Sequence, residues 1–370
     1  MEEREVVTCF LRHEGAILLC RRSEAVGSYP GRWGAVAGHA EGDSDGAARD
    51  EIREETGLDP QRDVTLVRRG ESFAVTDDER GTRWLVTPFL FDSETRAVEP
   101  NWETERYEWV APTAIRDRET VPDLWESYDR VRPSVATIAR DREHGAAYVS
   151  VRALEVLRDE AALAARRGDD LSGVVAVARD LLSARPSMSV LANRVNRVMH
   201  AARDADSPRA VEHAASAAIA DAVGADRRAA EHAAGRLTGR RVATLSRSGT
   251  VLDALRIGDP AAVLVAESRP GGEGVGVAET LADDCEVTLT TDAGFGHALS
   301  TWDADLLLVG ADTVLGDGRV VNKVGTRPAA VSASLEGIEV VVAAAVDKVS
   351  RETNVDLEPR DPVDLYDGPA

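Results

Sequence analysis

Hydrophobic and polar residues alternate through much of the first 110 residues, which is the pattern of β-strands with one face in a core. Residues 4–22 contain two such runs on either side of a His13-Glu14-Gly15 turn, so a pair of short strands is predicted there. Between the strands, Ala47, Ala48 and Ile52 can form the buried face of a helix, which Gly57 can end in the left-handed conformation. Further strands are predicted at residues 64–67, 72–75, 83–91 and 107–110.

The pattern changes twice after residue 146. Residues 149–236 are rich in Ala, Leu and Arg, with apolar positions at i, i+3 and i+7 as in Leu154, Leu157 and Ala161, which predicts helices and no strands. After Gly239, short apolar runs alternate with helical segments, and this βαβ alternation predicts a mainly parallel, doubly wound sheet. The predicted strands of that sheet are residues 241–245, 262–266, 286–290, 306–309 and 340–345.

The sequence therefore predicts an α/β fold class, with a strand-rich region, a helical region and a βαβ region in turn. A chain of 370 residues is long enough for two domains. We place a first domain at residues 1–142 and a second at residues 146–370. The second divides into a helical subdomain, residues 146–238, and a Rossmann-like subdomain, residues 239–370.

Composition restricts the partners of the protein. Acidic residues outnumber basic ones by 65 to 44, for a formal net charge of −21, and Lys323 and Lys348 are the two lysines. Abundant acid with almost no lysine resembles proteins of salt-accumulating halophiles, in which acidity serves solvation. The net charge argues against direct binding of nucleic acid, because that binding depends on neutralising phosphates.

Other features restrict the compartment. Cys9, Cys20 and Cys285 form neither a disulfide framework nor a zinc pattern. The N-terminus lacks the layout of a signal peptide, and the longest strongly apolar run, around residues 340–346, is too short to span a bilayer. We expect a soluble, cytoplasmic protein that makes no contact with membranes.

Three glutamates on the predicted helix, Glu51, Glu54 and Glu55, share one helix face because their spacing is i, i+3 and i+4. Like charges at this spacing destabilise a helix by about 0.2–0.5 kcal/mol per pair, and a bound cation would reverse that effect. Hard oxygen ligands with room for water and phosphate suit Mg²⁺ or Mn²⁺. The three glutamates are therefore candidate metal ligands, and the alternative is an ordinary acidic surface helix.

The segment around these glutamates resembles the Nudix box, a loop–helix–loop that binds a divalent metal and hydrolyses a nucleoside diphosphate linked to another moiety. R-E-E-T-G-L at residues 53–58, with Glu51 before it, carries the resemblance. Gly31-Arg32-Trp33-Gly34 before the box and W-E-T-E-R-Y-E-W-V at residues 102–110 after it also match. Two departures are a loop from Gly38 that is about two residues short and Asp50 in place of the family arginine.

The Nudix resemblance implies an α/β/α sandwich over residues 1–142 and a bound Mg²⁺ or Mn²⁺. Glu51, Glu54 and Glu55 would hold the metal, and one glutamate of this set would act as general base. Glu105 would supply a further ligand or base.

Four polar segments follow predicted strands of the last subdomain, at residues 244–250, 267–270, 310–312 and 322–326. Open α/β sheets bind ligands at the carboxyl ends of their strands, and helix N-termini bind phosphate. The candidate ligand-binding residues in these segments are Ser246, Arg247, Ser248, Gly249, Glu267, Arg269, Asp312, Asn322 and Lys323. In a chain with two lysines, Lys323 and Lys348 are expected where a compact ammonium is needed, the alternative being chance retention on the surface.

These segments resemble the family that joins the alpha, beta and delta subunits of translation initiation factor 2B with methylthioribose-1-phosphate and ribose-1,5-bisphosphate isomerases. E-S-R-P from 267, G-A-D from 310 and N-K-V-G-T from 322 carry the resemblance. It implies a helical subdomain followed by a Rossmann-like one, and a homodimer. It also implies that Asp312 stands at the position of the family's catalytic aspartate. The position of the family's catalytic cysteine is occupied here by Ser246. Serine is a much weaker acid than cysteine, so Ser246 argues against isomerase activity.

The first hypothesis for function is a Mg²⁺-dependent hydrolase of a nucleoside diphosphate derivative, fused to a regulatory domain that binds a phosphorylated sugar or nucleotide. A second is a non-catalytic, initiation-factor-like binding protein, which the short box loop and Asp50 favour and the intact glutamate set opposes. A third is a sugar-phosphate isomerase, which Ser246 opposes. We further expect the homodimer to form through the second domain, with the terminal segment Asp364-Leu365-Tyr366-Asp367 as one contact.

Overall fold

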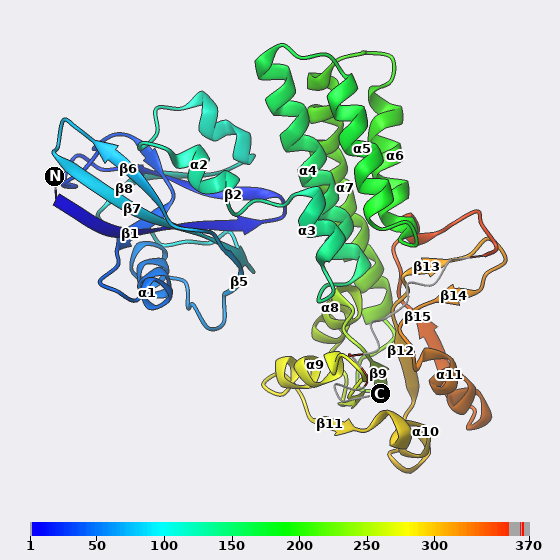
Figure 1. Cartoon of the computed structure of the whole chain (residues 1–370). Helices are drawn as coiled ribbons and strands as arrows, with labels where there is room; N and C mark the ends of the chain where they lie inside the picture. The colour runs from blue at the N-terminus through cyan, green and yellow to red at the C-terminus, as the bar shows by residue number, and fades with distance from the viewer. Residues whose placement is uncertain (1, 355–362, 364, 366–370) are drawn as a thin grey trace. The chain divides into compact units, whose positions relative to one another are not determined.

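The computed structural model describes residues 2–354, 363 and 365. The chain divides into two compact units, Met1–Ser134 and Val135–Ala370 (Figure 1). This division lies earlier than the boundary at residues 142–146 that the sequence suggests, because helix α3 (Val135–Arg140) packs on helices of the second unit. Of the terminal segment 364–367, all but Leu365 lies outside the described residues. No helix in the described ranges is long and apolar enough to cross a membrane.

The first unit is built around an eight-stranded mixed sheet in which β1 and β7 run parallel and the other pairs run antiparallel. Its strands are β1 (Glu2–His13), β2 (Ala16–Arg22), β3 (Trp33–Gly34), β4 (Val36–His39), β5 (Val64–Arg69), β6 (Phe73–Asp77), β7 (Thr82–Ser93) and β8 (Thr104–Val110). Its helices are α1 (Ser44–Thr56), the 3-10 helix η1 (Pro112–Asp117) and α2 (Leu124–Asp129). Every strand predicted in this region is present, and α/β is the observed class.

Strand alternation divides the core of the first unit into two layers. Val7, Cys9 and Leu11 of β1 belong to the layer that α1 covers through Ala48 and Ile52. Phe10 and its neighbours belong to the layer that η1 and α2 cover. The unit is thus a sheet between helical layers, in agreement with the predicted sandwich.

The ends of α1 follow from its sequence. The Asp43 carboxylate accepts a hydrogen bond from the Gly46 N–H at 3.0 Å and caps the first turn. Gly57 adopts φ +72° just past the last turn, as predicted, and its N–H donates to the Arg53 carbonyl. These two caps fix which turn of the helix carries the three glutamates.

The second unit begins with helices and ends with a sheet. After α3 come α4 (Ala146–Arg167), α5 (Ser172–Ala184), α6 (Ser189–Ala202) and α7 (Pro208–Ala234), which lie side by side as a bundle around an apolar core (Figure 1). The sheet has the strand order β11-β10-β9-β12-β15, and all its pairs are parallel. Its strands are β9 (Arg241–Leu245), β10 (Ala262–Ala266), β11 (Val287–Thr290), β12 (Leu306–Val309) and β15 (Glu339–Val342).

Apolar layers lie on both faces of this sheet, as a doubly wound fold requires. One layer joins it to the end of α7, α8 (Gly249–Gly258) and α9 (Glu273–Leu281), and the other to α10 (Asp292–Thr301) and α11 (Thr326–Leu335). A short hairpin of β13 (Thr313–Val314) and β14 (Val320–Val321) and the 3-10 helix η2 (Val346–Lys348) complete the unit.

A buried ion network ties the helical bundle to the end of the sheet. Arg194 of α6 is 1% exposed, and its guanidinium donates to the carboxylates of Asp347 on η2 and Asp226 on α7, both at 3.1 Å. It also donates to the Ser150 hydroxyl at 2.9 Å. Burial alone would raise the pKa of Asp347, but hydrogen bonds from Arg197 and Arg194 hold it below its ordinary value.

Candidate functional site

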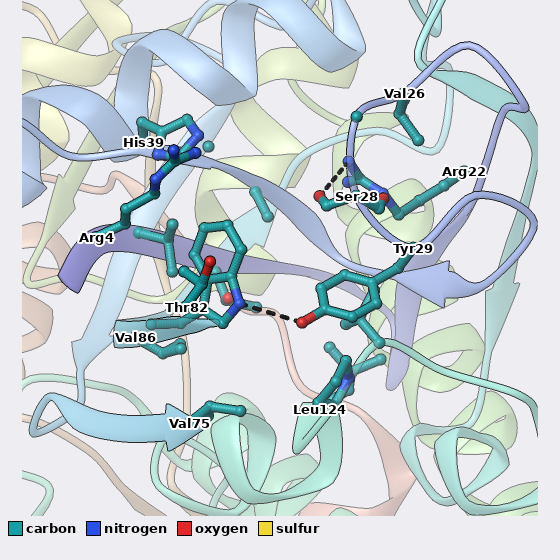
Figure 2. A pocket seen from close by; sticks show the side chains of 18 of the residues that line it. Arg4, Arg22, Val26, Ser28, Tyr29, His39, Val75, Thr82, Val86 and Leu124 are labelled. Atoms are coloured by element: carbon teal, nitrogen blue, oxygen red, sulfur yellow. Dashed lines mark hydrogen bonds between the residues drawn. The ribbon is translucent and has the colours of Figure 1, made fainter. Parts of the chain in front are cut away.

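A cavity of about 520 Å³ opens on one face of the sheet of the first unit (Figure 2). Strand alternation explains its lining, because residues paired across neighbouring strands point to the same face. Arg4 of β1 pairs with Trp84 of β7, and Val6 of β1 pairs with Val86 of β7 and His39 of β4. All five line the cavity, so a single face of β4, β1 and β7 forms its floor.

Two of the three predicted glutamates converge at the end of β4. Glu55 is 5% exposed and accepts a hydrogen bond from the Ala37 N–H at 2.9 Å. Glu51 lines the cavity and lies against Gly38, where a Cβ atom would be 1.6 Å from Glu51 Oε1. A side chain at position 38 would therefore displace that carboxylate from its place. Glu54 is exposed on the same helix.

The carboxylates of this site repel one another in a partly buried setting. Burial and the charges of Glu54 and Glu103 raise the pKa of Glu51 to about 7. Burial also raises the pKa of Glu55 to about 8, against the opposing effect of the Ala37 N–H. A cluster of like charges with unfavourable solvation is an arrangement that a cation stabilises.

The fourth acid near the site is Glu103, which the sequence reasoning missed. Glu103 precedes β8 and lines the cavity, and its charge acts on both Glu51 and Glu55. Glu105, the predicted fourth residue, is exposed and pairs with Arg21 at 2.7 Å. Glu103 lies in the segment before β8, which begins at Thr104, whereas Glu105 lies within that strand.

Arg22, at the end of β2, is a cation of the cavity. Its guanidinium donates from Nε to the Ser28 carbonyl at 2.8 Å and from Nη2 to the Ser28 hydroxyl at 3.4 Å. Among the described residues Arg22 forms no ion pair, and its charge acts on Glu55. A guanidinium held in place without a carboxylate partner suits a phosphate group.

The donor set of this corner fits a hard divalent cation. Its side-chain donors are carboxylate oxygens, the ligands of Mg²⁺ and Mn²⁺. Within residues 2–354, 363 and 365, no three His, Cys, Asp or Glu side chains meet closely enough to hold a metal by themselves. A metal at this corner would need water or substrate phosphates to complete its coordination, as Mg²⁺ commonly does.

The second group of predicted residues surrounds the switch point of the parallel sheet. β10 and β11 extend from β9 on one side, and β12 and β15 lie on the other, so the strand order reverses between β9 and β12. Ser248, after β9, caps α8 and lies so close to Gly310, after β12, that a Cβ atom on Gly310 would be 2.6 Å from the Ser248 hydroxyl oxygen. Arg247 donates to the Glu143 carbonyl at 2.7 Å, which connects this loop to the segment before α4.

The loops after β9 and β10 are held together by hydrogen bonds. The Ser246 N–H donates to the Ser268 hydroxyl at 2.6 Å, and both serines adopt left-handed φ angles, +63° and +65°. Such angles are uncommon for residues other than glycine and cluster at functional sites. Asp292 accepts from the backbone N–H groups of Ser268 and Arg269 at 2.9 and 2.6 Å. The sequence reasoning missed Asp292, although it too follows a strand, β11.

The remaining predicted residues lie in ion pairs or hydrogen bonds. Arg269 pairs with Glu267 at 3.1 Å, and Lys323 pairs with Glu273. The Asn322 amide donates to the Thr326 hydroxyl at 3.0 Å. These contacts hold the side chains in place at the carboxyl edge of the sheet.

The other lysine, Lys348, is 3% exposed, although it follows Asp347 on the short helix η2. Burial lowers the pKa of Lys348, and the charges of Asp226 and Asp312 act in the opposite direction. Asp312 itself is exposed, and its N–H donates to the Val321 carbonyl at 2.8 Å. A buried ammonium therefore lies in the field of the predicted catalytic aspartate.

Fold and sites together describe a two-part α/β protein, and comparison with known families gives its class. Residues 142–368 match the Initiation factor 2 subunit family, and the chain belongs to this family. Residues 1–131 match the NUDIX domain, so the first unit is a Nudix domain. Both predicted resemblances are confirmed.

Particular relatives support the assignment of the second unit. Methylthioribose-1-phosphate isomerase of Stenotrophomonas maltophilia is 33% identical over 128 residues, which are 32% of this chain and 36% of the relative. Ribose 1,5-bisphosphate isomerase of Haloferax volcanii is 38% identical over 109 residues, 28% of this chain and 33% of the relative. The chain spans about a third of the length of these two relatives.

Solved structures show the same fold. The translation initiation factor eIF-2B of Pyrococcus horikoshii superposes with a TM-score of 0.55 at 25% identity, covering 61% of this chain and 83% of that structure. The 5-methylthioribose 1-phosphate isomerase of the same organism gives a TM-score of 0.52 at 21% identity, covering 62% of this chain and 72% of that structure.

Proposed function

We propose that the first unit hydrolyses the diphosphate bond of a nucleoside diphosphate linked to another moiety, with Mg²⁺ or Mn²⁺ held by Glu51, Glu54 and Glu55. The observation that carries the proposal is the pair of carboxylates at Ala37 and Gly38, one of which, Glu51, lines a cavity that also presents Arg22 and Glu103. Carboxylates and a guanidinium in one cavity provide ligands for a metal and for the phosphate that it neutralises.

Each group of the chain has a place in this reaction. A metal held by these glutamates would supply polarisation of the diphosphate and a water of lowered pKa. Arg22 holds a phosphate oxygen, since its guanidinium lines the cavity and Ser28 fixes its direction. A glutamate of the cluster accepts a proton from the water. The oxygen of the water attacks phosphorus, and the bridging P–O bond breaks. Glu51, Glu54, Glu55 and Glu103 are the candidates for that base.

The test is a screen of the purified full chain with Mg²⁺ against nucleoside diphosphate derivatives, at molar and at low salt. We expect phosphate-bond cleavage that EDTA abolishes and added Mg²⁺ or Mn²⁺ restores. Cleavage that persists in EDTA contradicts the metal assignment. A folded chain that binds these compounds without cleaving them supports the non-catalytic alternative.

For the second unit we propose binding of a phosphorylated sugar or nucleotide at the switch point of the sheet, without isomerisation. Asp312 follows β12, Asn322 and Lys323 follow the hairpin of β13 and β14, and Ser248 caps a ten-residue helix, α8, whose N-terminus faces the same edge. Ser246 stands where the family resemblance places a catalytic cysteine, and a hydroxyl is a poor proton carrier at neutral pH. Ligand binding there would regulate the hydrolytic unit.

A second candidate function is sugar-phosphate isomerisation, because relatives named as isomerases match this unit and Asp312 is retained beside Lys348. The full chain is incubated with ribose 1,5-bisphosphate and, separately, with methylthioribose 1-phosphate. We expect binding by calorimetry and no ketose product. Formation of ribulose 1,5-bisphosphate would replace the proposal with this second function.

We also propose a homodimer formed through the second unit. Each chain carries a formal charge of −21, so assembly should weaken at low salt, where repulsion between copies is unscreened. Light scattering of the full chain in molar and in low salt measures the effect. A monomer at molar salt contradicts the proposal.

A further inference from the structure

The cavity of the first unit extends beyond its carboxylates into an apolar and aromatic region. Val6 on β1, Val75 on β6 and Val86 on β7 lie around Trp84, since Val75 pairs with Trp84 across the sheet and Val86 is two residues along the same strand. His39, next to Gly38, has its ring centre 6.0 Å from that of Trp84. The aromatic region therefore begins beside the residue against which Glu51 lies.

The indole of Trp84 is held by a chain of hydrogen bonds. Its Nε1–H donates to the Tyr29 hydroxyl at 3.1 Å, and that hydroxyl donates to Asp77 Oδ2 at 2.6 Å. Arg80 pairs with Asp77 at 3.2 Å and lies over the Tyr29 ring, with its guanidinium carbon 4.8 Å from the ring centre. Figure 2 shows the Tyr29 hydroxyl directed into the cavity, with the dashed bond that reaches it.

This network holds one orientation of a large aromatic side chain that is only partly buried. Burial and the hydrogen bond to Asp77 raise the pKa of Tyr29 to about 12, so the hydroxyl keeps its proton at neutral pH. A fixed indole face beside valines offers dispersion and stacking to a flat ring.

We propose that Trp84 stacks on the planar base of the diphosphate substrate and that Tyr29 and Asp77 are positioning residues that hold the indole for it. The inference rests on the proposed hydrolytic function and adds the group that the site selects. Substrates whose non-phosphate part is not aromatic, such as a sugar diphosphate without a base, would lack this contact.

The experiment compares two stable ligands on the full chain with Mg²⁺ by calorimetry. α,β-Methylene adenosine diphosphate carries the base, and methylenediphosphonate carries only the phosphonate pair. We expect the first to bind more tightly, and Trp84→Ala to weaken it about 10- to 100-fold, the effect of losing one base–aromatic stack. The same substitution should leave methylenediphosphonate affinity unchanged. Trp109→Phe, outside the cavity, is the matched control.

Tyr29→Phe tests the positioning role, because it keeps the ring and removes the hydroxyl. We expect weaker binding of the adenine ligand, a raised KM for a nucleoside diphosphate substrate and an unchanged kcat. Asp77→Asn keeps an accepting oxygen for the Tyr29 hydroxyl and should retain most of the affinity.

The outcomes separate two failures. If the wild-type chain with Mg²⁺ binds neither ligand, the proposed hydrolytic function fails and this inference with it. If both ligands bind and Trp84→Ala weakens them equally or not at all, the inference fails alone. Lost binding of both ligands in a Trp84→Phe variant that melts like the wild type would likewise overturn the stacking role.

Discussion

Two corners of this molecule bury charge in opposite ways. Where α6 and α7 meet η2, Arg194 is enclosed by the carboxylates of Asp347 and Asp226, and each charge has an opposite partner. Where α1 meets β4, Glu51 and Glu55 are brought together with Glu103 nearby, and within the part of the chain that the structure describes no hydrogen bond joins them to a cation. The pKa of Asp347 is lowered in the first corner, and the pKa values of Glu51 and Glu55 are raised in the second.

The difference separates a structural role from a functional one. A buried charge with an opposite partner holds two elements in register, and its role is in the folded structure. Unpaired like charges destabilise the fold that holds them and persist where a ligand compensates them. The α1–β4 corner is therefore expected to control activity with little effect on stability, and the α6–η2 corner to do the reverse.

The largest effect is expected from Arg194→Met. Removing one partner of a buried ion network leaves buried carboxylates unpaired, at about 3–5 kcal/mol of unfolding free energy. Urea unfolding of the second unit measures the loss, and hydrolysis by the first unit should continue. Arg197→Met is the control, because Arg197 contacts the same Asp347 but its side chain is 54% exposed, and such pairs contribute under about 1 kcal/mol. Equal losses in the two variants would contradict the structural role of Arg194.

The same network predicts a dependence on pH. Because the pKa of Asp347 is lower in the folded chain than in the unfolded one, its contribution to stability is fully present above the unfolded value of about 3.9. The contribution is lost as the pH falls through the folded pKa. Arg194→Met should lose less stability on acidification than the wild type, which unfolding curves between pH 3 and pH 6 would show.

Glu55→Gln should lower hydrolysis about 10²–10³-fold, the range for removing one group that stabilises developing charge. The amide oxygen can still accept from the Ala37 N–H, so the urea midpoint should be unchanged or higher. Glu54→Gln, at an exposed position, should give a similar loss of activity if all three glutamates hold the metal. Turnover equal to the wild type in both variants would contradict the assignment.

Gly38→Ala sharpens the comparison, because it adds one methyl group and no charge. The new Cβ would require Glu51 Oε1 to move from its position 1.6 Å away, and a displacement of that size can lower turnover about 10- to 100-fold. A double-mutant cycle with Glu51→Gln tests whether the loss of turnover in Gly38→Ala comes from displacement of Glu51. If the methyl acts through Glu51, it should have little further effect in the Gln background, whereas additive losses would place its effect elsewhere.

Substitutions of Glu103 and Glu105 should have smaller effects on turnover, and their ranking shows which of the two acids belongs to the site. Glu103 lines the cavity, so Glu103→Gln should lower kcat about tenfold, as loss of a supporting acid at a metal site does. Glu105 pairs with Arg21 on an exposed surface, and Glu105→Gln should stay within about twofold of the wild type. Steady-state kinetics decides between them, and the reverse ranking would favour the assignment made from sequence.

The smallest effect is expected in the second unit. A Cβ atom on Gly310 would lie 2.6 Å from the Ser248 hydroxyl oxygen, so Gly310→Ala should weaken binding of ribose phosphates by about tenfold or less. Gly276→Ala is the control, because nothing lies within 4 Å of its added Cβ on α9. Calorimetry on the full chain measures both, and hydrolysis should be unchanged in each. Unaltered affinity in Gly310→Ala would place the ligand away from the switch point.

Local patterns were sufficient for much of this protein. Strands β9, β10 and β12 have the predicted bounds, since a continuous apolar run between turn residues has one solution in a buried parallel sheet. The end of α1 at Gly57 and the shared face of Glu51, Glu54 and Glu55 follow from helix geometry alone. Both family resemblances rest on such short motifs, which is why they could be seen in the sequence.

Tertiary structure decided what surrounds those motifs. The parallel pairing of β1 with β7 joins residues about 80 positions apart and brings Trp84 beside Arg4, and no local spacing encodes that register. Glu103 lies in the segment before β8 and lines the cavity, whereas Glu105 lies within β8 and pairs with Arg21 on an exposed surface, and the position of that strand boundary depends on how β8 pairs with β2. Local spacing therefore predicts which residues could form a site. Whether those residues lie together depends on the long-range register of the strands, which the packing of the whole core sets.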